Sequence, residues 1–409
     1  MPSVSEQLEI LCRGVVDLHV RGELEERLAS GRPLRVKAGF DPTRPDLHLG
    51  HTVLMEKMRQ FQELGHRVIF LVGDFTAMVG DPTGRNEQRP RLTREQVREA
   101  AHTYQSQAFK VLDRDRTEIR YNSEWLGELS TAQLIALCAR YTVARMLERD
   151  DFAKRFAENR PIHVHEFLYP LLQGYDSVVL ECDVELGGAD QLFNLLVGRD
   201  LMPRYGLRPQ CVMTTPLLVG TDARLVDGRV VGAKMSKSVG NYVGVDEPPF
   251  EMLQKLMLID DQVIWHFMDL LSPRPPDELR ALRAAVDAGT TSIVAAKEQL
   301  ARDILGRYHE PAAVEDAFAR RRAISRGGAP DDVPELWVTS TSEQIGLAKA
   351  LQLAGLAAST SEAARLIKQG GVYLDGERAP DDKLALRRGE CHLVRIGSKK
   401  RRFARVVIR

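Results

Sequence analysis

The sequence lacks several features that mark other classes of protein. No run reaches the roughly 18 unbroken apolar residues of a membrane-spanning helix, so no membrane partner is expected. The stretch Met1–Val20 carries Glu6, Glu9 and Arg13 where a secretory signal needs an apolar segment, which predicts a cytoplasmic protein. No internal repeat or low-complexity tract is present. With 409 residues and 44% hydrophobic content, the chain is expected to form two or three domains.

Cysteine is scarce and scattered. The five cysteines form no C-x-x-C pair and are widely spaced, at Cys12, Cys138, Cys182, Cys211 and Cys391. A disulfide scaffold needs more cysteine, and a structural zinc cluster needs closely paired ligands, so both are disfavoured. We expect reduced thiols and no dedicated metal site.

The formal net charge is zero, because 57 Lys and Arg balance 57 Asp and Glu. The balance hides a division of the chain. The segment Ser342–Arg409 holds 14 basic against 7 acidic residues, a net charge of +7, and the preceding residues hold 43 against 50, a net charge of −7. A basic appendage on a mildly acidic body indicates a polyanion, such as RNA, as the partner of the appendage.

A βαβ unit is indicated near the N-terminus. Leu34–Gly39 has the pattern of a strand, Gly50–Leu64 has helical apolar spacing, and Arg67–Val72 is a nearly all-apolar strand. Apolar strands joined by a crossover helix are typical of a doubly wound parallel sheet. Ligands bind beyond the carboxyl ends of such strands, so a site is expected in the loops after Gly39 and Val72.

Three domains are predicted. Helical patterns extend from Pro249 to Ile324, and Ser325–Pro334 has the composition of a linker. We predict an α/β fold with a doubly wound, Rossmann-like catalytic domain at residues 1–240, a helical connector domain at 241–330 and a small α+β RNA-binding domain at 335–409.

The segment Asp41–His51 follows the first predicted strand and opens the helix. Backbone N–H groups at a helix N-terminus, with imidazoles one turn apart at His48 and His51, can donate hydrogen bonds to a phosphate. Gly50 lets a nucleotide approach the backbone closely. A pair of histidines that caps a surface helix, or one that binds a metal, would give the same pattern.

A second segment, Lys234–Ser238, reads Lys-Met-Ser-Lys-Ser within a glycine-rich loop. Two lysines three residues apart can neutralise charge that develops on a leaving pyrophosphate. An ordinary lysine-rich surface loop is the alternative. Ahead of it, Asp227-Gly228 between two short apolar stretches predicts a hairpin with a type I′ turn.

A third set, Tyr169, Gln173 and Asp176, has the spacing i, i+4, i+7. On a helix these side chains share one face. A phenol, an amide and a carboxylate within an otherwise apolar helix predict the polar wall of a pocket, and a half-exposed amphipathic helix is the alternative.

The first two segments, about 185 residues apart, together resemble the paired signatures of class I aminoacyl-tRNA synthetases. The third set, with Gly80–Gly84 and Gly187–Gln191, resembles the pattern of the tyrosyl-tRNA synthetase family. The resemblance covers nearly the whole chain. It implies activation of L-tyrosine with ATP and Mg²⁺, transfer to the 3′ end of tRNA(Tyr), and a homodimer with its interface around Thr131–Phe156.

The resemblance implies roles for single residues in the tyrosine pocket. Asp81, Tyr169 and Gln173 would hold the ammonium group, Asp176 would accept the phenolic hydroxyl, and Gln191 would lie near the carboxylate. Lys37 stands where many relatives carry a tyrosine that also contacts the hydroxyl. It would donate that second hydrogen bond or pair with an acid.

The resemblance also implies an ATP site and a catalytic set. The ATP site would consist of Gly39, Asp41, His48, Gly50, His51, Gly188, Asp190, Lys234, Ser236 and Lys237. The catalytic residues would be Thr43, His48, His51, Arg85, Arg89, Lys234 and Lys237.

The C-terminal segment resembles a small RNA-binding fold shared with a ribosomal small-subunit protein. Its pattern includes a helix within Ser359–Gly371, which in that family lies on structured RNA. The RNA-binding residues would be Arg365, Lys368, Lys399, Lys400, Arg401 and Arg402. A solvated charged tail is the alternative.

Three other functions use part of this pattern. A tryptophanyl-tRNA synthetase-like enzyme shares both signatures, but the Tyr169 set and the C-terminal domain disfavour it. A catalytically silent RNA-binding paralogue is disfavoured by the intact histidines and lysines. A nucleotidyltransferase with the histidine segment alone would lack the lysine loop and the C-terminal domain.

Overall fold

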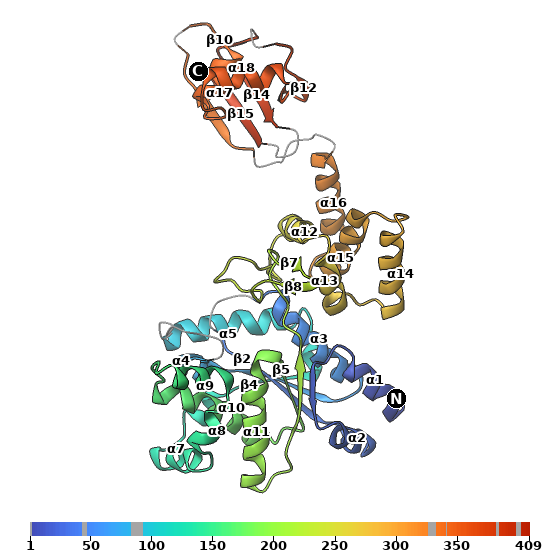
Figure 1. Ribbon diagram of the computed structural model, residues 1–409, viewed down its shortest axis with the longest axis vertical. Coiled ribbons are helices and arrows are strands. Elements are labelled where there is room, and N and C mark those ends of the chain that lie inside the picture. Colours follow the sequence, from blue (N-terminus) through green and yellow to red (C-terminus); the bar gives the residue numbers. More distant parts are fainter. Residues whose placement is uncertain are drawn as a thin grey trace. The chain divides into compact units, whose positions relative to one another are not determined.

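The computed structural model divides the chain into two units, Met1–Glu310 and Pro311–Arg409 (Figure 1). It describes residues 2–42, 47–82, 93–325, 333–340, 342–381, 384–397 and 402–409. None of the helices described is both long and apolar enough to cross a membrane.

A six-stranded sheet forms the centre of the first unit, in the order β1-β6-β5-β2-β3-β4. Its strands are β1 (Asp17–His19), β2 (Arg35–Phe40), β3 (Arg67–Val72), β4 (Thr117–Tyr121), β5 (Val184–Gly188) and β6 (Cys211–Thr215). They pair in parallel except for β1, which is antiparallel to β6 at one edge. The predicted doubly wound parallel sheet is confirmed, and its strand order reverses between β2 and β5.

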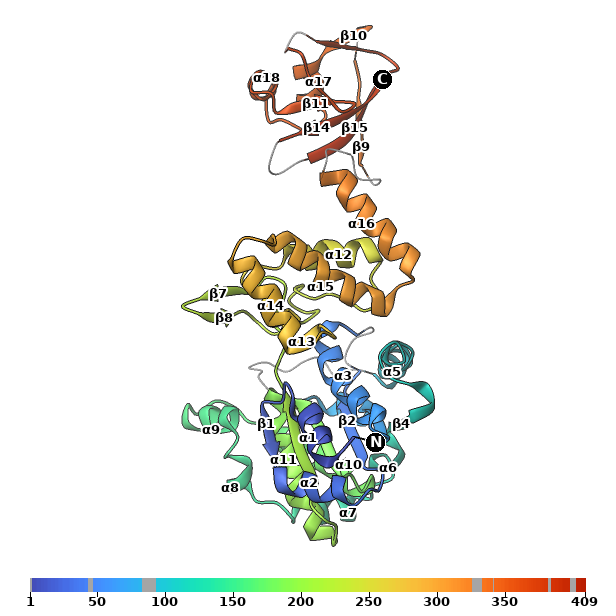
Figure 2. The same ribbon diagram turned by 90° about the vertical axis from the view of Figure 1, so that its right-hand side faces the viewer.

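Helices cover both faces of this sheet (Figures 1 and 2). The chain crosses from β2 to β3 in one direction and from β5 to β6 in the other. Right-handed crossovers therefore place α3 (Leu49–Glu63) and α11 (Leu192–Leu201) on opposite faces. The long helix α10 (Val164–Val179) packs against α11. The other helices of this region are α1 (Val4–Cys12), α2 (Arg21–Ala29), α4 (Asp74–Val79), α5 (Arg94–Ala108), α6 (Ser123–Leu126), α7 (Thr131–Cys138), α8 (Val143–Met146) and α9 (Asp150–Ala157).

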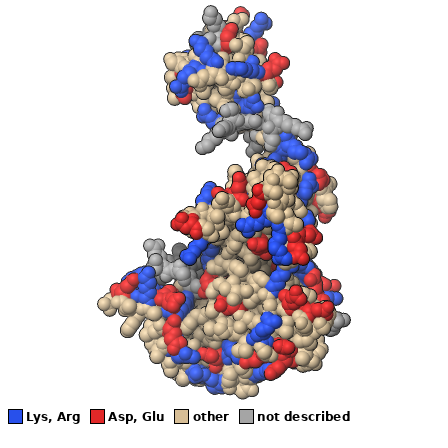
Figure 3. All heavy atoms as spheres, turned by 45° about the vertical axis from the view of Figure 1, so that its right-hand side comes forward, with Lys and Arg blue, Asp and Glu red and all other residues tan. Residues whose placement is uncertain are grey.

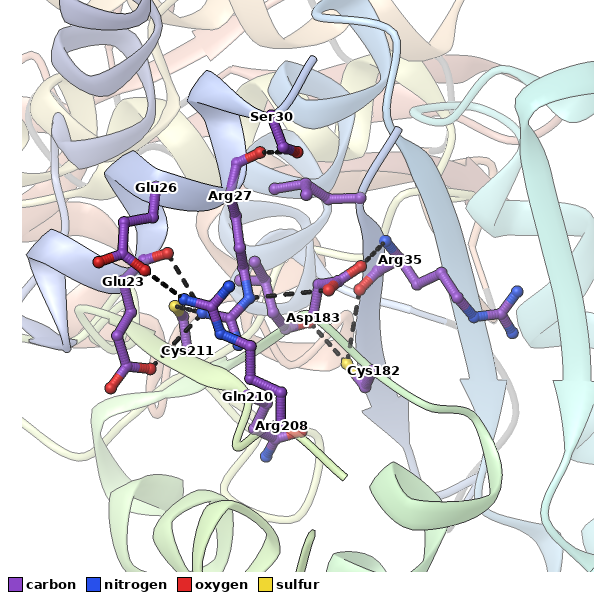
Figure 4. Close-up of polar contacts among 12 residues, drawn as sticks. Glu23, Glu26, Arg27, Ser30, Arg35, Cys182, Asp183, Arg208, Gln210 and Cys211 are labelled. Atoms are coloured by element: carbon purple, nitrogen blue, oxygen red, sulfur yellow. Dashed lines mark hydrogen bonds and ion pairs between the residues drawn. The ribbon is translucent and has the colours of Figure 1, made fainter. Parts of the chain in front are cut away.

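A polar cluster joins helix α2 to the amino ends of three strands (Figure 4). Arg27 is only 2% exposed and donates to the Pro209 carbonyl at 2.5 Å and to Sγ of Cys211 at 3.4 Å. Asp183 accepts the Arg35 backbone N–H at 2.9 Å and lies 3.7 Å from Nε of Arg27. These contacts hold the starts of β2, β5 and β6 together, at the edge opposite to the one where ligands bind in such sheets.

After β6 the chain forms a hairpin and then a helical region. The hairpin strands β7 (Arg224–Val226) and β8 (Arg229–Val231) are antiparallel. Their turn has φ of 49° at Asp227 and 74° at Gly228, so the predicted type I′ turn is confirmed. The helices that follow are α12 (Pro249–Leu258), α13 (Ile264–Leu271), α14 (Pro276–Asp287) and α15 (Ile293–Tyr308).

The second unit begins with α16 (Pro311–Ser325) and continues into a small α+β fold. A five-stranded sheet has the order β12-β11-β14-β15-β9, and β10 pairs with β13. Its core includes Leu347, Leu351, Val372, Val394 and Val406. The elements are β9 (Glu335–Val338), β10 (Gln344–Gly346), α17 (Leu347–Leu353), α18 (Thr360–Lys368), β11 (Val372–Leu374), β12 (Glu377–Arg378), β13 (Ala385–Arg387), β14 (Cys391–Ile396) and β15 (Arg402–Ile408).

The predicted linker lies between α16 and β9, and its residues 326–332 are outside the described part of the chain. The structure groups α16 with the C-terminal residues, whereas the predicted connector domain extends to residue 330. The division into three domains stays a prediction.

Candidate active site

A cavity of about 830 Å³ lies in the first unit, beyond the carboxyl ends of β2 and β5. This is the point where the strand order reverses, the usual ligand position in a doubly wound sheet. Thr43, Arg85 and Arg89 lie outside the described residues. The cavity is lined by all the other residues predicted for tyrosine, ATP or catalysis: Lys37, Gly39, Asp41, His48, Gly50, His51, Asp81, Tyr169, Gln173, Asp176, Gly188, Asp190, Gln191, Lys234, Ser236 and Lys237.

The two histidines begin helix α3 and cap it reciprocally. Nδ1 of His48 accepts the Gly50 backbone N–H at 3.1 Å, and Nδ1 of His51 accepts the His48 backbone N–H at 3.2 Å. Their ring centroids are 3.9 Å apart. A Cβ at position 50 would lie 2.9 Å from Cε1 of His48, so glycine is required for the ring to fold over the helix end.

Both imidazoles are neutral near pH 7. Burial, with repulsion from His51 and the two lysines of the loop, lowers the pKa of His48 to about 2, and burial lowers the pKa of His51 to about 4. Because each Nδ1 accepts a backbone N–H, the proton of each ring lies on Nε2. The pair therefore offers a ligand two N–H donors without positive charge.

The lysine segment contacts the glycine-rich turn after β5. Nζ of Lys234 lies 2.5 Å from Oδ2 of Asp190, and Nζ of Lys237 lies 5.5 Å from the ring centroid of Tyr242. Lys234 is 55% exposed, so its ion pair with Asp190 contributes little to stability and can be exchanged for a phosphate.

The hairpin β7–β8 is continuous with this lysine segment. The Gly220 N–H donates to the Ala233 carbonyl at 2.9 Å, which extends the hairpin ribbon toward Lys234. Buried Asn241 joins the two parts, because its Oδ1 accepts the Ser236 N–H at 2.8 Å and its Nδ2 donates to Asp222 at 3.1 Å. The position of the lysine loop is thus coupled to the hairpin.

The half-buried carboxylate of Asp41 lies beside the predicted ammonium site. The hydroxyls of Tyr169 and Thr76 donate to Asp41 at 2.8 and 2.7 Å. Burial raises the pKa of Asp41 to about 7, although the two hydrogen bonds act to lower it. Burial also raises the pKa of Tyr169 well above its usual value. Tyr169 therefore stays a hydrogen-bond donor, and a cationic ligand would stabilise the charged form of Asp41.

Asp81, predicted to hold the ammonium group of tyrosine, and Gln191, predicted to lie near its carboxylate, are neighbours. Nε2 of Gln191 donates to Oδ2 of Asp81 at 2.8 Å, and Oε1 of Gln191 accepts from Asn194 at 3.0 Å. This arrangement fixes the orientation of the Gln191 amide.

Asp176 is 2% exposed on the same face of α10 as Tyr169. Its Oδ1 accepts the indole N–H of Trp125 at 2.8 Å, and its Oδ2 accepts from Nδ2 of Asn122 at 3.3 Å. Burial raises the pKa of Asp176 to about 7, while the charge of Lys37 and the two donors oppose that rise. A ligand hydroxyl would meet an acceptor already oriented by two N–H groups.

Lys37 pairs with an acid, one of the two roles left open for it. It lies beside Glu185 in the register of β2 and β5, with Nζ 3.0 Å from Oε1. Its Nζ also donates to the hydroxyl of Ser177 at 2.7 Å, which donates to Glu185 at 3.0 Å. Burial favours the neutral amine, but attraction to Glu185 and Asp176 outweighs burial and raises the pKa of Lys37.

Comparisons with known proteins agree with this geometry. A family model for tRNA synthetases class I (W and Y) matches residues 29–324, and a model for the S4 domain matches residues 345–390. Tyrosine–tRNA ligase of Aromatoleum aromaticum is 53% identical over 409 residues and covers all of both chains. The chain belongs to the tyrosyl-tRNA synthetase family of class I. Tyrosine–tRNA ligase of Oleidesulfovibrio alaskensis is 52% identical over 99% of this chain and 100% of the relative.

Solved tyrosyl-tRNA synthetase structures show the same fold. A C-terminally truncated mitochondrial tyrosyl-tRNA synthetase of Aspergillus nidulans has a TM-score of 0.65 at 21% identity and covers 79% of this chain and 94% of that one. Tyrosyl-tRNA synthetase of Archaeoglobus fulgidus, complexed with L-tyrosine, has a TM-score of 0.60 at 23% identity and covers 78% and 99%. The predicted family and fold class are confirmed.

The predicted RNA-binding residues of this synthetase chain lie in the second unit. Helix α18 buries Ala363 and Ile367 and exposes Arg365 and Lys368. Arg402 begins β15 and donates from Nη2 to the Leu356 carbonyl at 2.9 Å. Lys399, Lys400 and Arg401 lie outside the described residues.

The sheet of the second unit carries a row of arginine and aromatic side chains. The strand register places Arg378, Tyr373, Arg395 and Phe403 directly opposite one another on four neighbouring strands, and such residues share a face. The Arg395 guanidinium lies 3.6 Å from the ring centroid of Tyr373. Figure 3 shows Lys and Arg side chains on the visible face of this unit. Such a row suits contact with nucleic acid.

Sequence reasoning missed several residues that line the synthetase cavity or contact its lining. Asn122 and Trp125 follow β4, a strand that the sequence pattern did not reveal because its residues are all half-buried. Glu185 carried a usable signal, since it is an acid between buried apolar neighbours in β5. Thr76 and Ser177 carried no such signal.

Proposed function

We propose that this chain activates L-tyrosine with ATP, forming tyrosyl-adenylate and pyrophosphate, and then transfers tyrosine to the 3′ end of tRNA(Tyr). The predicted tyrosine–tRNA ligase activity is the one named for the relatives that are 50–53% identical. The observation that carries the proposal is that the Tyr169 face of α10, the histidine segment and the lysine segment line one and the same cavity.

The pocket chemistry supports tyrosine as the substrate. Asp176 supplies an oriented acceptor for a phenolic hydroxyl. Asp81, Tyr169 and Gln173 would hold the ammonium group, near the carboxylate of Asp41. Because a buried acceptor without a partner costs free energy, phenylalanine would bind less well than tyrosine.

The nucleotide end needs charge stabilisation and no general base. The tyrosine carboxylate is already anionic when it attacks the α-phosphate, so catalysis rests on positioning and on donors for the pentacoordinate phosphate. His48 and His51 would each donate an Nε2–H, and Lys234 and Lys237 would bind the pyrophosphate. Thr43, Arg85 and Arg89 are proposed for the same task by resemblance.

Mg²⁺ would arrive with the phosphates of ATP. Among the described residues, no group of three or more His, Cys, Asp or Glu side chains could hold a metal ion. We therefore assign no side chain of the described residues to Mg²⁺.

The second unit would bind tRNA. Its S4 match and its exposed Arg365 and Lys368 support an RNA-binding role for residues 335–409. We retain residues 1–240 as the proposed catalytic domain and 241–330 as the connector, and we place the protein in the cytoplasm.

We also propose a homodimer. The consecutive helices α7 to α10 expose large apolar side chains at Ile135, Val143, Phe156 and Val164, between 61% and 78% exposed. Because a contiguous patch of exposed apolar groups marks an interaction surface, we propose that these helices form the interface. Sedimentation should show a dimer, and the double variant Phe156→Asp/Val164→Asp should be monomeric. The matched change Leu258→Asp, at a side chain 76% exposed in α12, should leave the dimer intact, and loss of association in that control would contradict the assignment.

Amino acid-dependent exchange of pyrophosphate with ATP tests the function. Among the proteinogenic amino acids, tyrosine should give the highest kcat/KM. A preference for tryptophan would assign the chain to the tryptophan branch. No exchange with any amino acid, alongside retained binding of tRNA(Tyr), would establish the silent RNA-binding paralogue.

A further inference from the structure

A fully buried ion pair forms part of the cavity wall. Lys37 and Glu185 are 0% and 1% exposed, they stand side by side on β2 and β5, and both line the cavity. Burying two charges costs free energy that their attraction seldom returns in full. An apolar pair would serve a purely structural role at least as well, so the charges point to a role in the cavity.

The pair is connected to the helix that carries Asp176. Nζ of Lys37 donates to the hydroxyl of Ser177 at 2.7 Å and to the Gln173 carbonyl at 3.4 Å, and these residues lie on either side of Asp176 along α10. Lys37 and Asp176 attract each other electrostatically, and Glu185 repels Asp176. The three groups form one buried charge cluster with one cation and two carboxyl groups.

We propose that Lys37 is a positioning residue for tyrosine selection that acts through Asp176. Its charge favours the carboxylate form of Asp176, which accepts a strong hydrogen bond from a phenolic hydroxyl, and Glu185 opposes this effect. The inference rests on the proposed tyrosine ligase function and deepens it, because it makes tyrosine recognition depend on the balance between one buried cation and one buried anion.

The balance gives opposite signs for two substitutions. Without Lys37, Asp176 is protonated up to a higher pH, so tyrosine binding weakens near neutral pH and recovers as the pH rises. With Glu185 made neutral, the pull of Lys37 is unopposed, so tyrosine binding persists to lower pH. The pKa of Asp41 is also about 7 and Asp41 repels Asp176, but its hydrogen-bond partners Thr76 and Tyr169 are unaltered in both variants.

The groups that face Asp176 come from every element packed around it. They are Lys37 on β2, Glu185 on β5, Asp41 after β2, Tyr169 on α10 itself, and the uncharged donors Asn122 and Trp125 near α6. Among these, Lys37 is the cation, so its removal has the largest expected effect on the charge of Asp176.

The test is the pH profile of KM for tyrosine in pyrophosphate exchange, measured with the full chain from about pH 6 to about pH 9. Lys37→Met should raise KM for tyrosine about fivefold near pH 7, as expected for a rise of about one pH unit in the pKa of Asp176, with little change near pH 9. Glu185→Gln should move the same profile to lower pH. KM for ATP should stay within about twofold in both variants, because the histidine and lysine segments are untouched.

Arg27→Met is the matched control, since Arg27 is also a fully buried cation with acidic neighbours but lies at the amino ends of the strands. It should lower stability without moving the profile. If Lys37→Met fails to fold, the acid shift of Glu185→Gln decides the question. Shifts of the same sign in both variants, or no shift in a protein with normal exchange, would overturn this inference alone. No tyrosine-dependent exchange in the unaltered chain would overturn the proposed function together with it.

Discussion

Replacing Asp176 with asparagine is expected to lower kcat/KM for tyrosine by at least about a hundredfold, because the charged acceptor for the phenolic hydroxyl is lost. The amide can still accept the Trp125 N–H, so the pocket should keep its shape. The NH₂ group of the new asparagine would then take the place of Oδ2, where it cannot accept a hydrogen bond from Asn122 or from the ligand hydroxyl. Asp176→Ala leaves the Trp125 N–H without its acceptor, whereas Asn122 keeps its hydrogen bond to Thr76, and the loss of the carboxylate should abolish tyrosine use.

The measurement is steady-state pyrophosphate exchange with tyrosine and with phenylalanine. The preference for tyrosine over phenylalanine should fall along with the rate, while KM for ATP stays unchanged. Asp200→Asn makes the same chemical change on α11 at a residue outside the cavity lining and should behave like the unaltered chain. Normal use of tyrosine by Asp176→Asn would mean that the hydroxyl binds elsewhere.

Removing residues 335–409 is expected to lower the kcat/KM of tRNA charging by about a hundredfold at moderate salt, because several phosphate contacts are lost at once. Adenylate formation should change by less than about twofold, since the cavity lining lies entirely in the first unit. Both rates are measured on one preparation, by pyrophosphate exchange and by charging of tRNA(Tyr).

Two further measurements separate RNA contact from a general loss of stability. In the full chain, Arg365→Ala/Lys368→Ala should weaken charging and reduce its dependence on salt, because fewer counterions are released on binding. Added salt should weaken charging by the unaltered chain before it affects adenylate formation. Equal loss of both activities in the truncated chain would refute a role of this region confined to RNA.

The fold was predictable where local pattern and global topology agree. The βαβ unit that starts the doubly wound sheet and the type I′ turn at Asp227-Gly228 follow from apolar runs and turn chemistry. Strand β4 did not follow, because its half-buried residues lack the apolar run of β3. The start of the C-terminal unit could not be predicted either, because the sequence pattern of α16 is that of the helices before it.

The candidate site was predictable as a set of residues but not as a set of contacts. The family resemblance implied that the histidine, lysine and Tyr169 segments share one site, and all three line one cavity in the structure. The partners of Asp176 come from residues far away in sequence, Asn122 and Trp125, and no local pattern connects them. The role of Lys37 stayed open because the identity of its acid depends on the register of β2 and β5.

The central claim is that one cavity holds tyrosine and ATP with the phenolic group at Asp176. A crystal structure of the full chain with a nonhydrolysable analogue of tyrosyl-adenylate tests it most directly. The account predicts the phenolic oxygen at about 2.7 Å from an Asp176 oxygen. It also places the ammonium group among Asp81, Tyr169 and Gln173, and the phosphate mimic within reach of His48 and His51. An analogue bound outside this cavity, or bound in it with the aromatic ring toward the histidines, would contradict the account.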